Sequence, residues 1–255
     1  MCFPYDARPP ITPIAGAAVD SEDLVLQSKD GTKFAAFVAR AENPSGAGIV
    51  ILPDVRGLYP FYEELALRFA EEGINAVAFD FFGRTAGVAK RDENFDFWPE
   101  VRQTKAESIA EDVRACLDYL RSAEGGSCTS LFTVGFCFGG SNSWLQAAWH
   151  GDLSGAIGFY GRPGPSFADN SAGPIDRAKE MKAPILALMG GDDPGIPADD
   201  IAALERALND AGVENEVVTY EGAPHSFFDR HYQEHADASS DAWRRCLEFV
   251  RKHAK

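Results

Sequence analysis

The 255-residue sequence has little of several features that would each point to a particular class of protein. No apolar run approaches the length needed to cross a membrane, and no charged-then-apolar leader opens the chain. Basic residues number only 24 against 39 acidic ones, and the net charge of −15 argues against a nucleic-acid or anionic-membrane partner. We therefore expect a cytoplasmic protein with no membrane and no nucleic-acid partner.

The cysteines are also few, which bears on disulfides and on metals. There are five, an odd number without regular spacing, and this fits a reducing cytoplasm better than a disulfide framework. No zinc site is expected, because four of them show no ligand spacing with histidine or with one another: Cys2, Cys116, Cys128 and Cys246. The chain has neither a Gly-x-Gly-x-x-Gly nor a phosphate-loop pattern, so we expect no nucleotide cofactor, and no other cofactor is predicted.

What the sequence does have is an alternation of apolar strand patterns and helix patterns, without repeats or low-complexity linkers. Strands separated by helices imply a mostly parallel sheet covered by helices on both faces. Residues 29–32, Lys-Asp-Gly-Thr, signal a hairpin that would add antiparallel strands at one edge. We predict a single α/β domain over residues 1–255, with residues 1–20 as an irregular N-terminal segment. The predicted strands are 24–28, 33–39, 48–52, 76–79, 131–134, 156–160, 184–189 and 216–220, and the predicted helices are 61–72, 101–122, 141–148 and 237–252.

The most informative motif is Gly-x-Cys-x-Gly at residues 135–139, which follows an apolar, β-branched run and precedes a helix pattern. This strand–turn–helix context is that of a nucleophile elbow, where the residues flanking the nucleophile must be small because the turn is tight. The central residue is usually serine, but here it is Cys137. At a helix N-terminus a thiol ionises more easily than a free cysteine does. The alternative is a buried cysteine that only packs between glycines.

Two downstream strand ends carry the other residues that a triad needs. The strand at 184–189 runs into Gly-Gly-Asp-Asp, and the strand at 216–220 runs into a loop that contains His225. The resulting order of nucleophile, acid and base is the order of α/β-hydrolases. Both Asp192 and Asp193 are candidates for the acid, and either could instead cap the helix that starts near Ala198.

With these motifs the chain resembles the dienelactone hydrolases, a cysteine-nucleophile branch of the α/β-hydrolases. The resemblance runs from about Asp23 to the C-terminus. It is carried by Gly-Phe-Cys-Phe-Gly-Gly at 135–140, Gly-Gly-Asp-Asp-Pro-Gly-Ile-Pro at 190–197, Gly-Ala-Pro-His-Ser-Phe at 222–227, and residues 49–57. It implies the α/β-hydrolase fold and a small-molecule ester or lactone substrate. The oligomeric state is not implied, and a monomer is compatible with the sequence.

The resemblance assigns the catalytic roles as follows. Cys137 would attack the ester carbonyl, His225 would take the thiol proton and later activate water, and an aspartate would orient the imidazole. Asp193 is preferred over Asp192, because the family pattern puts the acid three residues before an apolar-Pro pair, here residues 196–197. The oxyanion hole would be the backbone N–H groups of Phe138 and Val55.

Asp54 is a departure from the family pattern, in which a glutamate at this position interacts with the resting cysteine and is displaced by substrate. A carboxylate near Cys137 would raise the pKa of the thiol and hold it neutral. Aspartate is one methylene shorter, so it would reach the thiol only if its loop lies closer. The alternative is a structural bond from Asp54 to Arg56 or to the backbone.

The substrate-binding residues are expected from the resemblance as well. Arginines near two strand ends would hold a substrate carboxylate, and Arg84 matches the first of them. Arg230 lies one residue beyond the family spacing from the histidine. Ser226 in the histidine motif and Tyr160 after a buried strand complete the candidate set, although Tyr160 could equally be a core aromatic.

Three functions compete at this stage. The first is a cysteine-dependent ester or lactone hydrolase acting on a small anionic enol-lactone. The second is another acyl-transfer enzyme, such as a thioesterase or a peptidase-like enzyme. The third is a binding or redox-responsive protein that keeps the fold without turnover, and the acid and histidine in the expected loops count against it.

Overall fold

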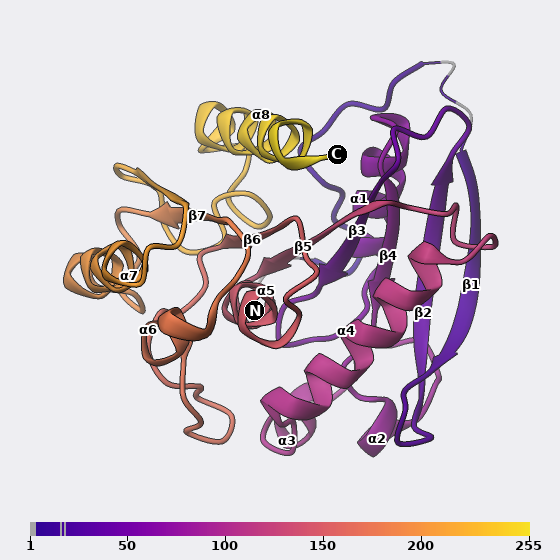
Figure 1. Cartoon of the computed structure of the whole chain (residues 1–255), viewed down its shortest axis with the longest axis horizontal. Coiled ribbons are helices and arrows are strands. Elements are labelled where there is room, and N and C mark those ends of the chain that lie inside the picture. Colours follow the sequence, from indigo (N-terminus) through magenta and orange to yellow (C-terminus); the bar gives the residue numbers. More distant parts are fainter. Residues whose placement is uncertain (1–3, 16, 18) are drawn as a thin grey trace.

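The computed structural model describes residues 4–15, 17 and 19–255, and its centre is one eight-stranded sheet in the order β1-β2-β4-β3-β5-β6-β7-β8 (Figure 1). The β1–β2 and β2–β4 pairs are antiparallel. The remaining neighbours, β4–β3, β3–β5, β5–β6, β6–β7 and β7–β8, are parallel. This confirms the predicted α/β-hydrolase fold class, including the antiparallel hairpin at one edge. The strands are β1 (Val19–Gln27), β2 (Lys33–Ala41), β3 (Ala47–Leu52), β4 (Asn75–Phe79), β5 (Ser130–Phe136), β6 (Gly155–Phe159), β7 (Ile185–Gly190) and β8 (Asn215–Tyr220).

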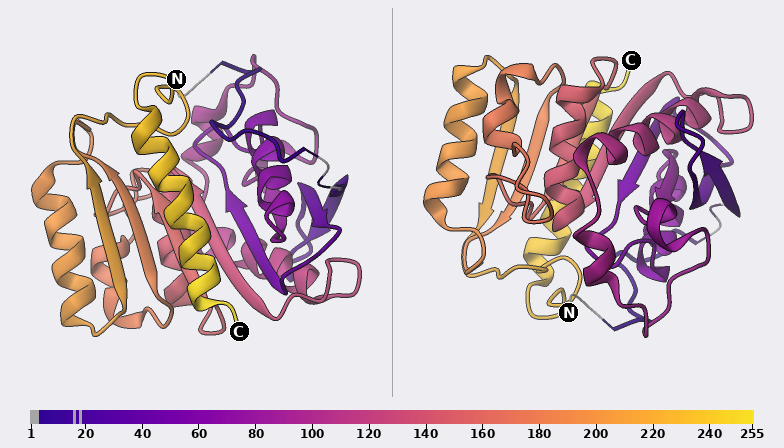
Figure 2. Two further views of the ribbon diagram at one scale, coloured as in Figure 1. Left: turned by 90° about the horizontal axis from the view of Figure 1, so that it is seen from above. Right: turned by 90° about the horizontal axis from the view of Figure 1, so that it is seen from below.

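Helices cover both faces of this sheet (Figure 2). On one face α8 crosses β6 and β7 while α1 packs on β2 and β4; on the other face α4 lies on β3 and β4, and α5 lies on β5 and β6. The helix α7 packs along the edge strand β8. The helical segments are α1 (Pro60–Glu71), α2 (Gly83–Ala86), α3 (Phe97–Val101), α4 (Ala106–Arg121), α5 (Phe138–Trp149), α6 (Pro174–Arg177), a 3-10 turn (Ala178–Glu180), α7 (Ala198–Asp210) and α8 (Ala236–His253).

The central strands position the site because their carboxyl ends meet at one edge of the sheet. All residues of β3 to β7 are buried, as expected for parallel strands covered on both faces. In open α/β sheets, ligands bind outside the carboxyl ends of the strands. We therefore expect the residues of the site in the loops after β3, β5, β7 and β8.

The largest difference from the predicted elements concerns the helix expected over residues 101–122. In the structure this helix, α4, begins only at Ala106, and Val101 is the last residue of the separate short helix α3. Between them the hydroxyl of Thr104 donates to the carbonyl of Val101 at 2.7 Å, and such a local bond competes with the helical ladder. At the N-terminus, β1 begins at Val19, five residues earlier than predicted, whereas residues 4–15 and 17 have neither helix nor strand.

Within the described part of the chain, no helix is both long and apolar enough to span a bilayer. The cysteines Cys116, Cys128, Cys137 and Cys246 are all free thiols. Cys2 lies outside the described residues.

Candidate active site

The nucleophile elbow occupies the junction between β5 and α5. Cys137 follows the last residue of the strand and precedes the first residue of the helix, and its backbone has φ 56° and ψ −115°. A positive φ is unfavourable for a residue with a Cβ, so the surrounding structure must hold this conformation. One such restraint is the hydrogen bond from the Cys137 N–H to the carbonyl of Phe159 on β6, at 3.0 Å.

The glycines of the motif are required by backbone packing. A Cβ on Gly135 would lie 1.9 Å from the carbonyl oxygen of Gly139, and a Cβ on Gly139 would lie 2.1 Å from the carbonyl oxygen of Leu52. Both distances are far inside van der Waals contact and involve rigid backbone atoms. The first turn of α5 therefore packs directly against the end of β3, which brings the loop after β3 close to the elbow.

The acid and the base come from the loops after β7 and β8. The imidazole Nδ1 of His225 lies 2.6 Å from Oδ2 of Asp193, and the other oxygen of this buried carboxylate accepts the N–H of Gly195 at 2.8 Å. Asp192 is exposed, and its backbone N–H donates to Ala223. Of the two candidate acids the structure therefore brings Asp193 to the histidine. Neither aspartate caps α7, whose N-cap residue Pro197 has no side-chain hydrogen bond.

Cys137 and His225 are hydrogen-bonded through their side chains, which completes a chain of contacts from carboxylate to imidazole to sulfur. Burial alone lowers the pKa of His225, but the hydrogen bonds to Asp193 and to Cys137 outweigh it and raise this pKa to about 10. The pairing therefore favours the imidazolium form of His225. A protonated imidazole beside the sulfur favours the thiolate form of Cys137.

The two candidate oxyanion residues lie on either side of the contact between α5 and the end of β3. Phe138 is the first residue of α5, and Val55 is the third residue after β3. Both are buried. Backbone N–H groups at these two positions come from different strand ends, as they do in α/β-hydrolase oxyanion holes.

Asp54 is engaged by Arg56, which was the alternative to contact with the thiol. Its Oδ2 lies 2.7 Å from the guanidinium of Arg56, and its Oδ1 accepts the Arg56 backbone N–H at 2.9 Å. Both side chains are almost fully buried. The expected role as a modulator of the Cys137 thiol gains no support from these contacts, because the carboxylate charge is already matched by an arginine two residues away.

Arg84, the arginine expected to anchor a substrate carboxylate, is engaged with carboxylates in a similar way. Its guanidinium donates to Asp112 of α4 at 2.6 Å and to Asp30 of the β1–β2 turn at 2.9 Å. Asp112 is buried and also accepts the hydroxyl of Ser28. Arg84 thus joins α2 to the hairpin and to α4, and two carboxylates already match its charge.

Tyr160, which was expected either to line the pocket or to be a core aromatic, has a fully buried side chain. Its hydroxyl donates to Oδ2 of Asp229 at 2.7 Å, and its ring centroid lies 4.9 Å from that of the His225 ring. The Tyr160 ring therefore packs against the histidine ring in the interior. Ser226 is buried with φ 64° and lies in the turn closed by the bond from the Asp229 N–H to its carbonyl. Arg230 is exposed at the end of this turn.

Asp229 is the residue at this site that the sequence did not single out, whereas Arg56 was named there as a possible partner of Asp54. Arg56 could be found from its spacing, since a carboxylate and a guanidinium two residues apart can pair in a turn. Asp229 carries no such signal, because its partner Tyr160 lies 69 residues away in the sequence.

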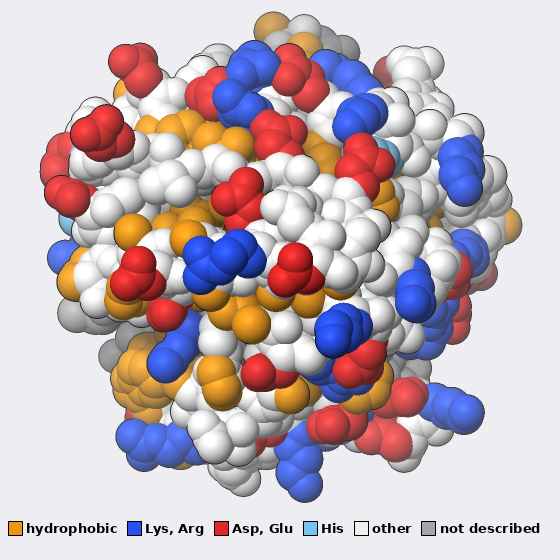
Figure 3. Space-filling model, turned by 60° about the vertical axis from the view of Figure 1, so that its left-hand side comes forward, with side chains coloured by type: hydrophobic (Ala, Val, Ile, Leu, Met, Phe, Trp, Pro, Cys, Tyr) orange, Lys and Arg blue, Asp and Glu red, His pale blue; other side chains and the backbone are white. Residues whose placement is uncertain are grey.

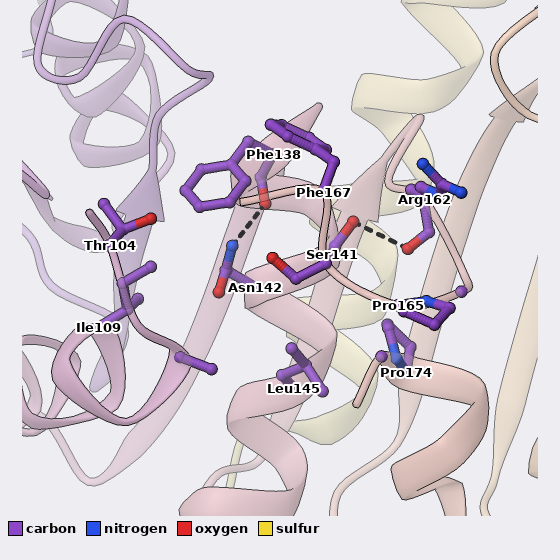
Figure 4. A pocket seen from close by; sticks show the side chains of 14 residues that line it. Thr104, Ile109, Phe138, Ser141, Asn142, Leu145, Arg162, Pro165, Phe167 and Pro174 are labelled. Atoms are coloured by element: carbon purple, nitrogen blue, oxygen red, sulfur yellow. Dashed lines mark hydrogen bonds between the residues drawn. The ribbon is translucent and has the colours of Figure 1, made fainter. Parts of the chain in front are cut away.

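A cavity of about 20 Å³, room for about one water molecule, lies beside Phe138 (Figure 4). Figure 4 shows Phe138 and Phe167 at one end of it, and their ring centroids are 5.4 Å apart. At the other side Ser141 donates to the carbonyl of Arg162 at 2.9 Å. Trp98, half-exposed, packs on Phe167. Next to the buried Phe138, the exposed side chains of Phe167 and Trp98 therefore form an apolar wall near the surface.

On the face of the molecule that Figure 3 shows, the charged side chains do not form a single patch of one sign. There, acidic and basic side chains are interspersed among apolar ones (Figure 3). The described residues hold no cluster of three or more His, Cys, Asp or Glu side chains arranged for a metal ion.

Comparison with known proteins gives three findings. The family model described as "Dienelactone hydrolase family" matches residues 34–254. Curated relatives from Escherichia coli and Yersinia pestis, both named "Putative carboxymethylenebutenolidase", are 27% and 29% identical to this chain; they cover 96% and 88% of it, and 94% and 85% of their own lengths. A crystal structure from Klebsiella pneumoniae, named "Putative Dienelactone Hydrolase", is 26% identical with a TM-score of 0.81, over 91% of this chain and 98% of that one.

Proposed function

Because this chain belongs to the dienelactone hydrolase family, we propose that it cleaves carboxylic esters and lactones through a thioester formed on Cys137. Family membership makes the protein an ester or lactone hydrolase; the nucleophile and the course of the reaction are the proposal. The observation that carries it is the hydrogen-bonded sequence of Asp193, His225 and Cys137, with the cysteine held in a strained turn at a helix N-terminus.

The first half of the reaction uses the thiolate. The sulfur of Cys137 attacks the carbonyl carbon of the substrate, and the carbonyl electron pair moves to oxygen to give a tetrahedral oxyanion. The backbone N–H groups of Phe138 and Val55 are the donors proposed for this oxygen. When the intermediate collapses, the C–O bond breaks, the leaving alkoxide or enolate takes the proton of the His225 imidazolium, and a thioester remains.

The second half returns the enzyme to its starting form. Neutral His225 accepts a proton from a water molecule, whose oxygen attacks the thioester carbonyl. Collapse of the second tetrahedral intermediate releases the carboxylic acid and the sulfur as thiolate, and the imidazole is again protonated. In both halves Asp193 stabilises the imidazolium, and it fixes the tautomer of the neutral imidazole.

For the substrate we propose a small anionic enol-lactone, of the kind implied by the name carboxymethylenebutenolidase that the relatives carry. For binding of the substrate carboxylate we propose Arg230, because it is exposed at the end of the loop that carries His225. Arg84, the other arginine expected to bind such a carboxylate, pairs with Asp112 and Asp30.

The test is ester hydrolysis by the Cys137→Ala variant. We expect wild-type protein to hydrolyse a simple aryl ester and an anionic enol-lactone, and the variant to lose turnover on both while its circular dichroism spectrum and melting temperature stay close to wild type. Iodoacetamide that labels Cys137 should abolish the wild-type activity. A Cys137→Ala protein that keeps wild-type turnover would contradict the proposal.

A further inference from the structure

The loop after β8 contains a second buried carboxyl group that the triad does not use. Asp229 lies four residues after His225 and is only 2% exposed. Its Oδ2 accepts the hydroxyl of Tyr160 at 2.7 Å, and its Oδ1 accepts the backbone N–H of Arg230. A buried carboxyl group costs free energy unless it is well hydrogen-bonded, so its retention beside the histidine calls for an explanation.

Tyr160 connects this carboxyl group both to the sheet and to the imidazole. It directly follows β6 in a backbone conformation with φ 38°, and its N–H donates to the carbonyl of Leu188 on β7 at 2.8 Å. Its ring lies against the His225 ring at 4.9 Å and a tilt of 55°. The tyrosine is therefore fixed at its backbone by β7 and at its hydroxyl by Asp229, with the imidazole in contact with its ring.

We propose that Tyr160 and Asp229 are positioning residues that hold His225 from behind, and that the ionised Asp229 carboxylate favours the imidazolium–thiolate pair with Cys137. The inference deepens the proposed function and rests on it for the role of Cys137. Asp193 restrains the imidazole through a hydrogen bond at Nδ1, whereas Tyr160 restrains it through a tilted ring contact. The two supports act on different motions of the ring.

The charged and polar groups around Asp229 decide when it is ionised. They are His225 and the backbone N–H of Arg230 in its own loop, the Tyr160 hydroxyl after β6, and Asp54 after β3, which is itself paired with Arg56. Burial raises the pKa of Asp229, the Tyr160 hydroxyl and the Arg230 N–H lower it, Asp54 raises it and His225 lowers it, and the result is about 7. The carboxylate should therefore form as the pH rises through neutrality.

The experiment compares the rate of Cys137 alkylation by iodoacetamide in wild type and Asp229→Asn across the pH range from about 5.5 to about 8.5. The asparagine keeps the shape and a hydrogen-bond acceptor but never carries charge. We expect equal rates at the acid end, where Asp229 is protonated, and a wild-type rate about 3- to 10-fold higher at the alkaline end, the effect of up to one pKa unit. A purely structural role predicts a ratio that does not change with pH, and that result would overturn the inference.

Tyr160→Phe is the second variant, which keeps the ring and removes the hydroxyl. Since the hydroxyl lowers the pKa of Asp229, its loss should move the pH-dependent step in the alkylation rate to higher pH. The matched control is Tyr220→Phe, because Tyr220 donates to Asp241 at 2.9 Å in the same kind of bond. A control profile that shifts as far as that of Tyr160→Phe would count against the inference, and if Asp229→Asn does not fold, these two profiles decide it.

Hydrolysis of the aryl ester is measured on the same samples, so the two proposals can fail separately. Wild-type protein that shows the pH-dependent alkylation ratio but does not hydrolyse esters would refute the proposed function and leave the positioning roles supported. Ester hydrolysis that depends on Cys137, together with an alkylation ratio that is constant with pH, would refute only the positioning roles.

Discussion

At the ends of β7 and β8 a buried aspartate holds a histidine, whereas at the ends of β3 and β4 buried aspartates hold arginines. Asp193 accepts from His225. Asp54 pairs with Arg56 at 2.7 Å, and Asp80 pairs with Arg91 at 2.8 Å. All of these carboxylates lie beyond the carboxyl ends of the sheet and are buried.

The difference lies in what the partner can do. An arginine stays protonated at any pH at which the protein is folded, so an aspartate–arginine pair can only fix a loop. Histidine changes its protonation within the working range, so an aspartate–histidine pair can move a proton. One half of the site is thus a rigid frame for the β3 and β4 loops, and the other half is the part that reacts.

The largest expected effect tests the reactive half. Asp193→Asn should lower kcat for ester hydrolysis by about 10⁴-fold, because it removes the carboxylate that orients and charges His225. Asp192→Asn is the matched control and should stay within about twofold of wild type, since surface substitutions have little effect. If Asp192→Asn were the crippled variant, the assignment of the acid would be wrong.

The next effect tests the frame. Asp54→Asn leaves the buried Arg56 guanidinium without its counter-charge, and we expect the free energy of unfolding to fall by about 3 kcal/mol in urea titrations. Asp80→Asn should cost a similar amount through Arg91, which makes it the control for a pair in the same half. Alkylation of Cys137 should change by less than about twofold in Asp54→Asn. A thiol that reacts much faster in this variant would restore the role of Asp54 as a modulator of the sulfur.

Arg84→Ala sharpens the comparison further. Loss of its bonds to Asp112 and Asp30 should lower the free energy of unfolding by about 2 kcal/mol, the scale of charge-assisted hydrogen bonds. Catalysis on an anionic lactone and on a neutral aryl ester should change by the same factor. A selective loss on the anionic substrate would show that Arg84 does reach the substrate.

A further effect is a pH dependence of stability that arises from His225. The pKa of His225 is raised to about 10 in the folded protein, against 6.5 without its partners. The stability it contributes is therefore fully present below about pH 6.5 and is lost as the pH rises through about 10. Melting temperatures of wild type should fall more steeply over this window than those of His225→Gln. Parallel curves for the two proteins would mean that the imidazolium pair does not stabilise the fold.

How far the sequence predicted these two halves depends on the range of the interactions. The elbow and the loops with Asp193 and His225 could be predicted, because each follows an apolar strand and strand ends meet at one edge. The pairing of Asp54 with Arg56 was open as an alternative, since the two lie in one turn. The partners of Arg84 could not be predicted, because Asp112 and Asp30 approach it only through the packing of α4 and the hairpin.

The same limit applies to element boundaries and to Asp229. The predicted helix began five residues too early, because its periodicity does not show the turn before α4, in which the Thr104 hydroxyl donates to the carbonyl of Val101. Asp229 cannot be told from an ordinary polar loop residue in the sequence, because only the fold brings Tyr160 into contact with it.

The packing of the elbow glycines has a consequence for how this chain tolerates mutation. Gly135 and Gly139 have no side chains and take no part in the chemistry, yet any added Cβ would collide with backbone oxygens. A saturation scan scored by activity should therefore show these two positions to be as intolerant as Cys137, although for a steric reason. The backbone at Cys137 already accommodates a Cβ at positive φ, so we expect that Cys137→Ser would not disturb the turn. The backbone of the elbow thus fixes the position of the nucleophilic atom, and this position can hold either a sulfur or an oxygen.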